Sequence, residues 1–321
     1  MRCWRAIASF AVVFSSCGLV FSLQSLAAEF KLTEHADGVR VEVDGKLFTE
    51  YVKRSGAKPI LYPLLGPSGD QMTRGYPIRE ATAKEKKDHV HHRSFWFTHG
   101  NVNGISFWHE NNKHGTIEHR EFNSVRGGAT GHISATNDWK GPDGKRVCQD
   151  IRTYVFHADS ERRWIDVEIT VLASDGEVTF GDTKEGSFGV RVAGSMRTEL
   201  PDGGKIVNSR GNTDGEAWGK QAEWVDYHGP VNGSVSGIAI LNHPSSFRFP
   251  TYWHVRTYGL FAANPFGLHD FKRDKSVDGS HRLDPKQSFR LRYRVLLHTG
   301  DEKKGRVAEM FQQYSKGSGK P

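Results

Sequence analysis

Hydrophobic and polar residues alternate over several short stretches of the chain. Val39, Val41 and Val43 alternate with polar residues and lead into Asp44-Gly45, a dipeptide typical of two-residue hairpin turns. The same period of two recurs over residues 165–171 and 291–297. Because successive side chains of a strand point to opposite faces, each stretch has one apolar face and one more polar face. The pattern predicts antiparallel sheets.

Turn signals separate these stretches, and helical spacing is convincing only near the C-terminus. The chain has 35 glycines, and Asp-Gly pairs recur at 143–144, 175–176, 202–203 and 278–279. We expect Asp301 to cap a helix that carries Val307, Met310, Phe311 and Tyr314 at spacings of three and four. The predicted fold class is therefore all-β: one large antiparallel β-sandwich, with a C-terminal helix packed on the flank of a sheet.

The first 27 residues are typical of a secretory signal peptide. Arg2 and Arg5 precede an apolar run, and Ser25 and Ala27 occupy the two small positions of a cleavage site. We predict a signal peptide over residues 1–27, a single β-sandwich domain over residues 28–321, and export to the periplasm or the extracellular space. No later stretch is apolar enough to predict a membrane span in the mature chain. Whether Cys17 is lipidated stays open.

The cysteine count excludes a disulfide-bonded protein, and the distribution of charge argues against a nucleic-acid-binding protein. Cys148 is the one cysteine after residue 27, which excludes an internal disulfide and predicts a buried, unreactive thiol. The net charge is +7, and removal of Arg2 and Arg5 with the signal leaves +5. Basic and acidic residues are interspersed, unlike a nucleic-acid footprint. This balance is compatible with anionic ligands such as acidic sugars.

The densest group of reactive side chains lies within residues 88–100. Here His89, His91 and His92 stand within four residues and are followed by Arg93 and Trp96. On a strand, His89, His91 and Arg93 would point to one face and His92 to the other. Such imidazoles can transfer protons and bind sugar hydroxyls, and an indole can stack on a sugar ring. We predict no cofactor, with a transition metal held by His89 and His91 as the alternative.

Two later segments carry further candidates. Residues 182–191 place acids and bases around two glycines, with Glu185 as a candidate general acid or base and Arg191 as a ligand-binding group. In residues 251–267, alternation would place Tyr252, His254, Arg256 and Tyr258 on one face. A face of this composition is costly to bury and more plausibly lines a cleft, together with Asn264.

Several motifs in order carry a resemblance to a known family. They are Asp88-His89-Val90-His91-His92-Arg93, Lys184-Glu185-Gly186-Ser187-Phe188-Gly189, Ala217-Trp218-Gly219, Asn242-His243-Pro244 and Trp253-His254-Val255-Arg256. With these, the chain resembles the PmoA-like family of exported proteins over roughly residues 38–297. The resemblance implies a β-supersandwich of the galactose-mutarotase type, a scaffold that sugar epimerases, lyases and glycosidases share.

The leading hypothesis is a periplasmic carbohydrate-active enzyme of lyase, hydrolase or epimerase type, acting on a carbohydrate or another small polar substrate. Its predicted catalytic residues are His91, His92, Glu185 and His254, and its predicted substrate-binding residues are Arg93, Trp96, Arg191, Tyr252, Arg256 and Asn264. A non-catalytic glycan-binding module is one alternative. A metal-dependent oxygenase or hydrolase that uses the His-x-His-His cluster is the other.

Overall fold

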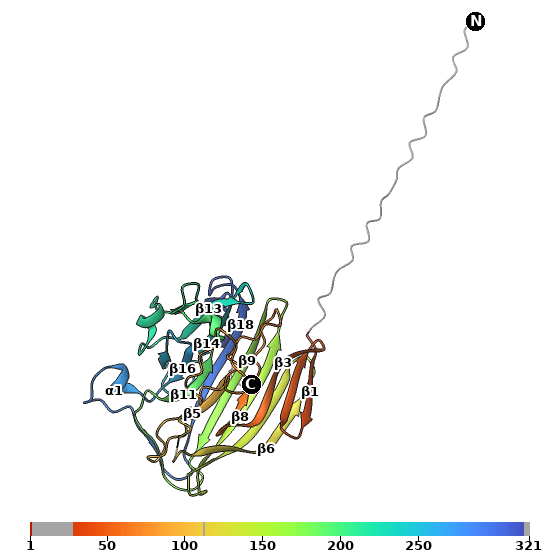
Figure 1. The fold of residues 1–321 in the computed structure, drawn as a ribbon. Coiled ribbons are helices and arrows are strands. Elements are labelled where there is room, and N and C mark those ends of the chain that lie inside the picture. The colour runs from red at the N-terminus through yellow and green to blue at the C-terminus, as the bar shows by residue number, and fades with distance from the viewer. Residues whose placement is uncertain (2–27, 112, 318–321) are drawn as a thin grey trace.

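Strands make up most of the regular structure in the computed structural model, which describes Met1 and residues 28–111 and 113–317 (Figure 1). The predicted signal peptide, including Cys17, lies outside the described residues. The first sheet has eight strands in the order β1 (Phe30–His35), β2 (Gly38–Val43), β3 (Lys46–Ser55), β4 (Lys58–Leu61), β5 (Phe95–His99), β11 (Gly186–Arg191), β16 (Leu260–Asn264) and β15 (Tyr252–Val255).

The second sheet is also eight-stranded, and every pairing in both sheets is antiparallel. Its order is β12 (Lys205–Asn208), β13 (Trp224–Val231), β14 (Ser234–Asn242), β18 (Ser288–Thr299), β9 (Arg162–Leu172), β8 (Arg146–Ala158), β7 (Gly131–Lys140) and β6 (Thr116–Arg126). A two-stranded ribbon pairs β10 (Val178–Phe180) with β17 (His281–Leu283). The short helical elements are η1 (Gly194–Met196), η2 (Asp214–Ala217), α1 (Leu268–Phe271) and α2 (Val307–Lys316).

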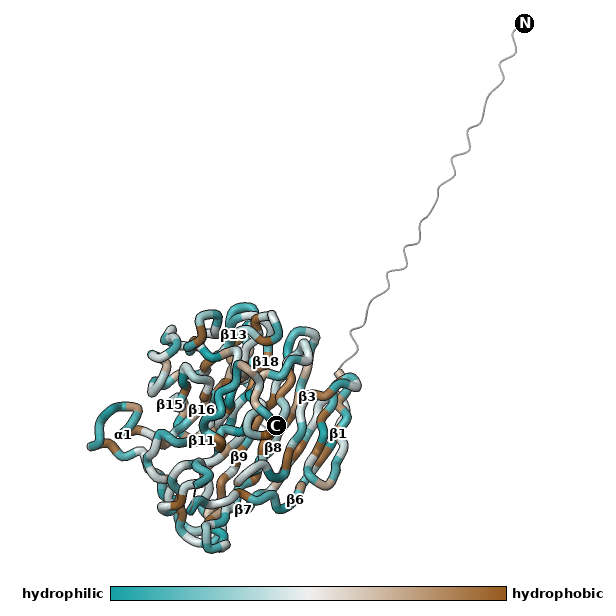
Figure 2. The backbone as a smooth tube through the Cα atoms, viewed as in Figure 1, coloured by the Kyte–Doolittle hydropathy of each residue, from teal (hydrophilic) through white to brown (hydrophobic). Residues whose placement is uncertain are grey.

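The predicted all-β sandwich with its C-terminal helix is confirmed, and the alternating stretches provide its core. Along β9, Ile165, Val167, Ile169 and Val171 are buried while the residues between them are half-buried. They belong to one continuous apolar cluster that both sheets share. Figure 2 shows hydrophobic and hydrophilic segments in alternation along the long strands. Cys148 is buried in the same cluster, and burial raises the pKa of its thiol.

The predicted hairpin at Asp44-Gly45 is also confirmed. Val43 pairs with Lys46, and the two residues between them have positive φ angles of 51° and 71°. Two consecutive positive φ values match the right-handed twist of the strands, and they explain why Asp-Gly occupies this turn.

The C-terminal helix starts later than its predicted cap. Asp301 accepts a hydrogen bond from the Lys304 amide in a separate turn, and α2 begins only at Val307 because Arg306 has a left-handed φ of 54°. The apolar side of α2 nevertheless packs on the second sheet as predicted, with Met310 and Tyr314 buried in a second apolar cluster. No helix in the described part of the chain is both long and apolar enough to cross a membrane.

Antiparallel pairing brings together segments that are far apart in sequence. β11 lies between β5 and β16, and β15 follows at the edge of the sheet. In Figure 1, α1 projects from the same end of the molecule as β11 and β16. Residues 88–100, 182–191 and 251–267, the three segments singled out from sequence, therefore become neighbours.

Candidate functional site

Alternate residues of β5, β11, β16 and β15 point to opposite faces of the first sheet. Phe97, Phe188 and Trp253 point inward and belong to the core between the sheets. Trp96 and Leu260 instead belong to a separate apolar cluster on the outer face, together with Trp108. The candidate residues that the sequence predicted on these strands lie at positions whose side chains point to the outer face. This outer face is the candidate site.

Trp96 lies flat on the sheet because Gly189 leaves room for it. A Cβ at residue 189 would lie 2.7 Å from the indole ring of Trp96. Gly189→Ala is therefore expected to lower the free energy of unfolding by about 1–3 kcal/mol through overpacking. Urea denaturation checks this, with Gly215→Ala as the control, since a Cβ there meets nothing within 4 Å. Equal stability of the two variants would contradict the packing.

The histidine segment is a loop and not the predicted strand. β5 begins only at Phe95, and His89 and Ser94 have positive φ angles of 43° and 53° that break the extended conformation. His92 consequently does not point away from its neighbours: its ring stacks on that of His89 at 4.8 Å and meets the His91 ring edge-on at 4.5 Å. The three imidazoles form one cluster.

Two arginines and an aspartate hold this loop in place. Asp88 Oδ1 accepts hydrogen bonds from Arg74 at 2.6 Å and from Arg191 at 2.9 Å. Arg74 also donates to the carbonyl oxygens of His89 and His92. Burial opposes ionisation of Asp88, but the two guanidinium groups outweigh it and lower the pKa of its carboxyl. The loop is anchored by charge-assisted hydrogen bonds.

Hydrogen bonding fixes the protonation of His92. Arg191 is a permanent donor and places its Nη1 3.0 Å from Nδ1 of His92, so Nδ1 must be the acceptor and the ring proton lies on Nε2. Burial and the Arg191 charge lower the pKa of His92 well below its usual value. Its lone pair is therefore occupied, and the predicted acid–base role does not fit this geometry. His92 can only donate a hydrogen bond.

His91 keeps both ring nitrogens free of protein hydrogen bonds among the described residues. Its ring lies 5.0 Å from that of His109 and 6.2 Å from that of Trp108. Burial, followed by the charge of Lys58, lowers the pKa of His91 to about 3. His91 is therefore a neutral imidazole at physiological pH, able to accept a proton or a hydrogen bond.

A buried ion triad lies beside His91 and accounts for Arg93. Glu110 accepts two hydrogen bonds from the guanidinium of Arg93 and one from Lys58 Nζ, at 2.8 Å. Lys58 is fully buried, and burial lowers its pKa to about 8 against the opposing charge of Glu110. Glu110 thus takes up the Nε and Nη2 donors of Arg93, whereas Nη1 has no partner in the described chain, so the predicted substrate-binding role of Arg93 stays a prediction.

Rings and guanidinium groups form a continuous stripe across the outer face, which we call the ring stripe. The His89 ring stacks on Tyr258 at 5.1 Å. The guanidinium carbon of Arg256 lies 5.8 Å from the Tyr258 ring and 5.7 Å from the Trp218 ring. Trp218 in turn meets His254 edge-on at 6.3 Å. The ring stripe thus connects the histidine loop to His254.

His254 is the imidazole whose geometry best fits proton transfer. Its Nδ1 lies 2.6 Å from the carbonyl oxygen of Lys184, which can only accept, so Nδ1 carries the proton and Nε2 the lone pair. No group in the described chain donates to that Nε2. Burial lowers the pKa of His254 to about 4, although the charge of Glu185 opposes this shift. His254 is a neutral, oriented proton acceptor.

Glu185 faces the same region from the adjoining turn. Its carboxylate is 3.3 Å from Lys184 Nζ and about one quarter exposed. Its charge raises the pKa of both His254 and Tyr258, against and with the effect of burial respectively. His91, Glu185 and His254 therefore adjoin the outer face of the sheet, and their joint catalytic role stays a prediction.

Several other predicted residues are engaged in structural contacts. Asn264 donates to the carbonyl oxygen of Thr183 and accepts from the Phe266 amide, so its side-chain amide supports the loops around it and its predicted binding role does not fit. The Trp96 ring is covered by His92, stacked at 5.4 Å, and offers no open face to a sugar. Tyr252 remains half-exposed and stacks on Phe271.

Arg191 and His99 are also buried. Arg191 is 1 % exposed and is bound by Asp88 and His92, so it supports the site from beneath instead of meeting a ligand. His99 lies on the inner face, where Nε2 donates to the carbonyl oxygen of Gly181 and the ring packs on Phe180 and Phe266. His99 thus belongs to the core although it is close in sequence to the histidine loop.

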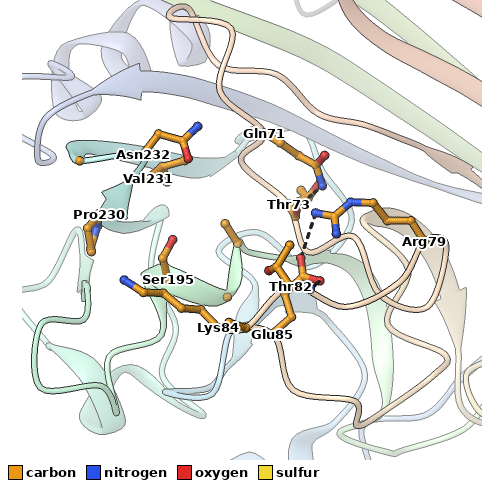
Figure 3. A pocket seen from close by; sticks show the side chains of 14 residues that line it. Gln71, Thr73, Arg79, Thr82, Lys84, Glu85, Ser195, Pro230, Val231 and Asn232 are labelled. Carbon is orange, nitrogen blue, oxygen red and sulfur yellow. Dashed lines mark hydrogen bonds and ion pairs between the residues drawn. The ribbon is translucent and has the colours of Figure 1, made fainter.

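A polar cavity of about 420 Å³ is lined by residues from segments 71–85, 193–195 and 230–233 (Figure 3) and by none from the histidine loop. Thr73 lines the cavity, whereas the guanidinium of the next residue, Arg74, binds Asp88 under the loop. The cavity's carboxylate, Glu85, accepts hydrogen bonds from the backbone amides of Gly75 and Thr82. It therefore holds segment 75–85 in place. None of the predicted site residues lines this cavity.

The described residues place ligand atoms suited to a metal at a different location. Asp226, His228 and Glu302 offer ligand atoms within 4.8 Å of one another on the second sheet. The predicted pair His89 and His91 is not part of such a group. Asp226 accepts 2.7 Å hydrogen bonds from both His228 Nδ1 and His298 Nε2. Its carboxylate oxygens therefore bind protons of the two histidines without a metal.

Sequence analysis missed one contributor to the candidate site, Lys58, which adds charge beside His91. Tyr258 and Trp218, which connect the two ends of the site, belong to segments that the sequence singled out. Tyr258 lies on the alternating face of residues 252–258, and Trp218 lies in the Ala217-Trp218-Gly219 motif. The sequence around Lys58 is an ordinary buried strand, so nothing in it indicates proximity to His91.

Comparison with solved structures gives distant likenesses. A beta-arabinopyranosidase is 11% identical with a TM-score of 0.29, and the GH36 alpha-galactosidase AgaB from Geobacillus stearothermophilus is 9% identical with a TM-score of 0.35. Each comparison covers 86% of this chain and 39% of the other, so the chain spans about two fifths of the length of either enzyme. Nothing about the activity of this chain follows from likenesses at this level. No curated protein matches the chain.

The sequence matches one protein family over residues 38–312, which includes all segments of the candidate site. That family is described as "Family of unknown function (DUF6807)". The predicted resemblance to the PmoA-like family is therefore wrong. Because the match spans most of the chain, the protein belongs to the Family of unknown function (DUF6807).

Proposed function

We propose that the protein is an exported carbohydrate-active enzyme that uses acid–base chemistry on the outer face of its first sheet. The observation that carries this proposal is the geometry of His254. The Lys184 carbonyl fixes its tautomer, and its Nε2 lone pair is free within the described chain. A proton acceptor held in this way, in a strip of aromatic rings, suits chemistry on a sugar.

The roles of the neighbouring groups follow from their contacts. His254 is the general base, and the neighbouring Glu185 carboxylate stabilises the imidazolium that forms when His254 accepts the proton. His91 is a second neutral imidazole at the other end of the ring stripe and accepts hydrogen bonds from substrate hydroxyls. His92 positions the loop and does not transfer a proton, because Arg191 occupies its lone pair.

Export rests on the N-terminal sequence. The basic, apolar and small-residue sections of residues 1–27 favour secretion, and we propose the periplasm or the extracellular space as the place of action. Polysaccharides are accessible substrates in both compartments.

Conversion of glycans by the purified protein tests the proposal. Wild-type protein is incubated with a panel of neutral and acidic polysaccharides, and the products are identified by mass spectrometry. The expected result is a shortened, unsaturated or epimerised product. Binding without conversion of any glycan would contradict the enzyme and favour the alternative of a glycan-binding module, for which the aromatic rings of Tyr258 and Trp218 would suffice.

Activity is expected to depend on pH through His254. A general base must be neutral, and the pKa of His254 is lowered to about 4. The rate should therefore stay level from neutral pH down to mildly acidic pH and fall as the pH drops through about 4, where the ring gains a proton. A pH–rate profile that falls near 6.5, the pKa of an unperturbed histidine, would contradict this assignment.

A further inference from the structure

The ring stripe is surrounded by more positive charge than the protein neutralises. Its neighbours include six basic side chains and four carboxylates: Arg74 and Arg191 with Asp88, Lys58 and Arg93 with Glu110, Lys184 with Glu185, Asp270 at the Lys184 amide, and Arg256 without a carboxylate partner. The excess among these groups is two positive charges. The adjacent imidazoles add no further charge at neutral pH, since the pKa values of His91, His92 and His254 are all lowered.

Arg256 is the basic group that the protein leaves available. It forms no ion pair and no side-chain hydrogen bond with the described residues, and it is half-buried. Two rings, Trp218 and Tyr258, contact its guanidinium. Such cation–π contacts restrict the motion of the guanidinium. Its N–H groups have no partner in the described chain and can bind two oxygens of an anion side by side.

Arg256 also lies close enough to His254 to bind a charged group of the sugar residue on which His254 would act. It is two residues from His254, at the end of the same edge strand, and its charge acts on both His254 and Tyr258. The indole Nε1 of Trp218, which contacts Arg256, is a buried donor with no acceptor in the described chain. Around Arg256 and Trp218, hydrogen-bond donors and positive charge thus outnumber the hydrogen-bond acceptors that the protein provides.

We propose that the substrate is an acidic glycan, and that Arg256 binds the carboxylate or sulfate group of the sugar residue that His254 acts on. This inference rests on the proposed function and adds the substrate class to it. A bidentate ion pair between Arg256 and the anion would fix the sugar ring on the ring stripe. For a carboxylate sugar, neutralisation by Arg256 would also make the adjacent C–H more acidic.

Binding to three galactose-based polymers tests the inference. Polygalacturonate carries carboxylates, κ-carrageenan carries sulfates and β-1,4-galactan is neutral, and the dissociation constant of each is measured by calorimetry. Wild-type protein is expected to bind at least one acidic polymer more tightly than the neutral one. Arg256→Met should weaken that binding by about 10-fold or more, the effect of losing hydrogen bonds to a charged group. Arg256→Lys keeps the charge but loses the paired geometry and should be intermediate.

Arg290→Met is the matched control, because Arg290 is an exposed arginine on the second sheet and its loss should change no affinity. A preference for polygalacturonate identifies a carboxylate, and a preference for κ-carrageenan identifies a sulfate. Neutral galactan bound as tightly as both acidic polymers, no binding to any of them, or acidic-polymer affinity that survives Arg256→Met would each overturn the inference. Conversion of neutral galactan that depends on His254 would overturn it while leaving the proposed function intact.

Discussion

Replacement of His254 by alanine is expected to lower the turnover of an identified glycan substrate by at least about 100-fold, the usual contribution of a positioned acid–base group. The reason is geometric. The Lys184 carbonyl holds the proton on Nδ1 at 2.6 Å, so Nε2 is the ring atom that can accept a proton from a substrate. The rate constant for turnover, measured at saturating substrate, checks the prediction.

A second variant separates catalysis from folding. His254→Gln can keep the hydrogen bond to the Lys184 carbonyl through its amide, but it cannot transfer a proton. It should therefore unfold at nearly the wild-type denaturant concentration and still lose turnover. His132→Ala, on β7 of the second sheet, serves as the histidine control and should retain full activity. Wild-type turnover in the folded His254→Gln variant would rule out His254 as the base.

The fold could be predicted from sequence because the alternation of apolar and polar residues along a strand follows the alternation of buried and exposed side chains. The residues that alternate along β2, β9 and β18 pack between two sheets, and the turn at Asp44-Gly45 needs the positive φ angles that this dipeptide tolerates. Which strands are neighbours could not be read from such local patterns. β5, β11 and β16 are adjacent although roughly 80 residues separate one from the next.

Sequence indicated which residues lie near the candidate site better than it indicated what each of them does there. Alternation along β15 correctly placed Tyr252 and His254 on one face. For Arg191 the residue type suggested ligand contacts, but Asp88 and His92 bind its guanidinium. For His92 the residue type suggested proton transfer, but Arg191 occupies the lone pair of Nδ1. Sequence shows which donors and acceptors exist, whereas pairing across sheets decides which of them remain free.

The second sheet contains a buried ion pair that sequence analysis did not single out. His298 donates from Nε2 to Asp226 at 2.7 Å and from Nδ1 to the Thr299 carbonyl at 3.2 Å. Two acceptors require two protons, so this ring is an imidazolium. Gly237 and Gly305 leave room for it, since a Cβ at either position would lie 2.3 Å from the ring. Asp226 raises the pKa of His298 against the effect of burial.

Asp226→Asn is expected to lower the free energy of unfolding by about 3–5 kcal/mol, because it leaves the buried His298 without its counter-charge. Urea denaturation at pH 6 checks this. The control is Glu118→Gln, which breaks an exposed pair with Lys140 and should cost about 1 kcal/mol or less. Similar losses in the two variants would mean that Asp226 and His298 are not an ion pair.

The pH dependence of stability gives an independent check on this pair. A histidine whose pKa is raised on folding contributes its full stabilisation below its unfolded pKa of about 6.5, and the contribution is lost as pH rises through the folded value. The carboxyl of Asp226 has a lowered pKa, so its contribution is lost only in strong acid. Buried histidines whose pKa is lowered, such as His91, His92 and His254, act in the opposite direction over this interval, so the informative quantity is the difference between two proteins. From pH 6 to pH 9, the change in the free energy of unfolding should be less favourable for wild-type protein than for His298→Gln. An identical pH slope in both proteins would show that His298 is neutral in the folded state.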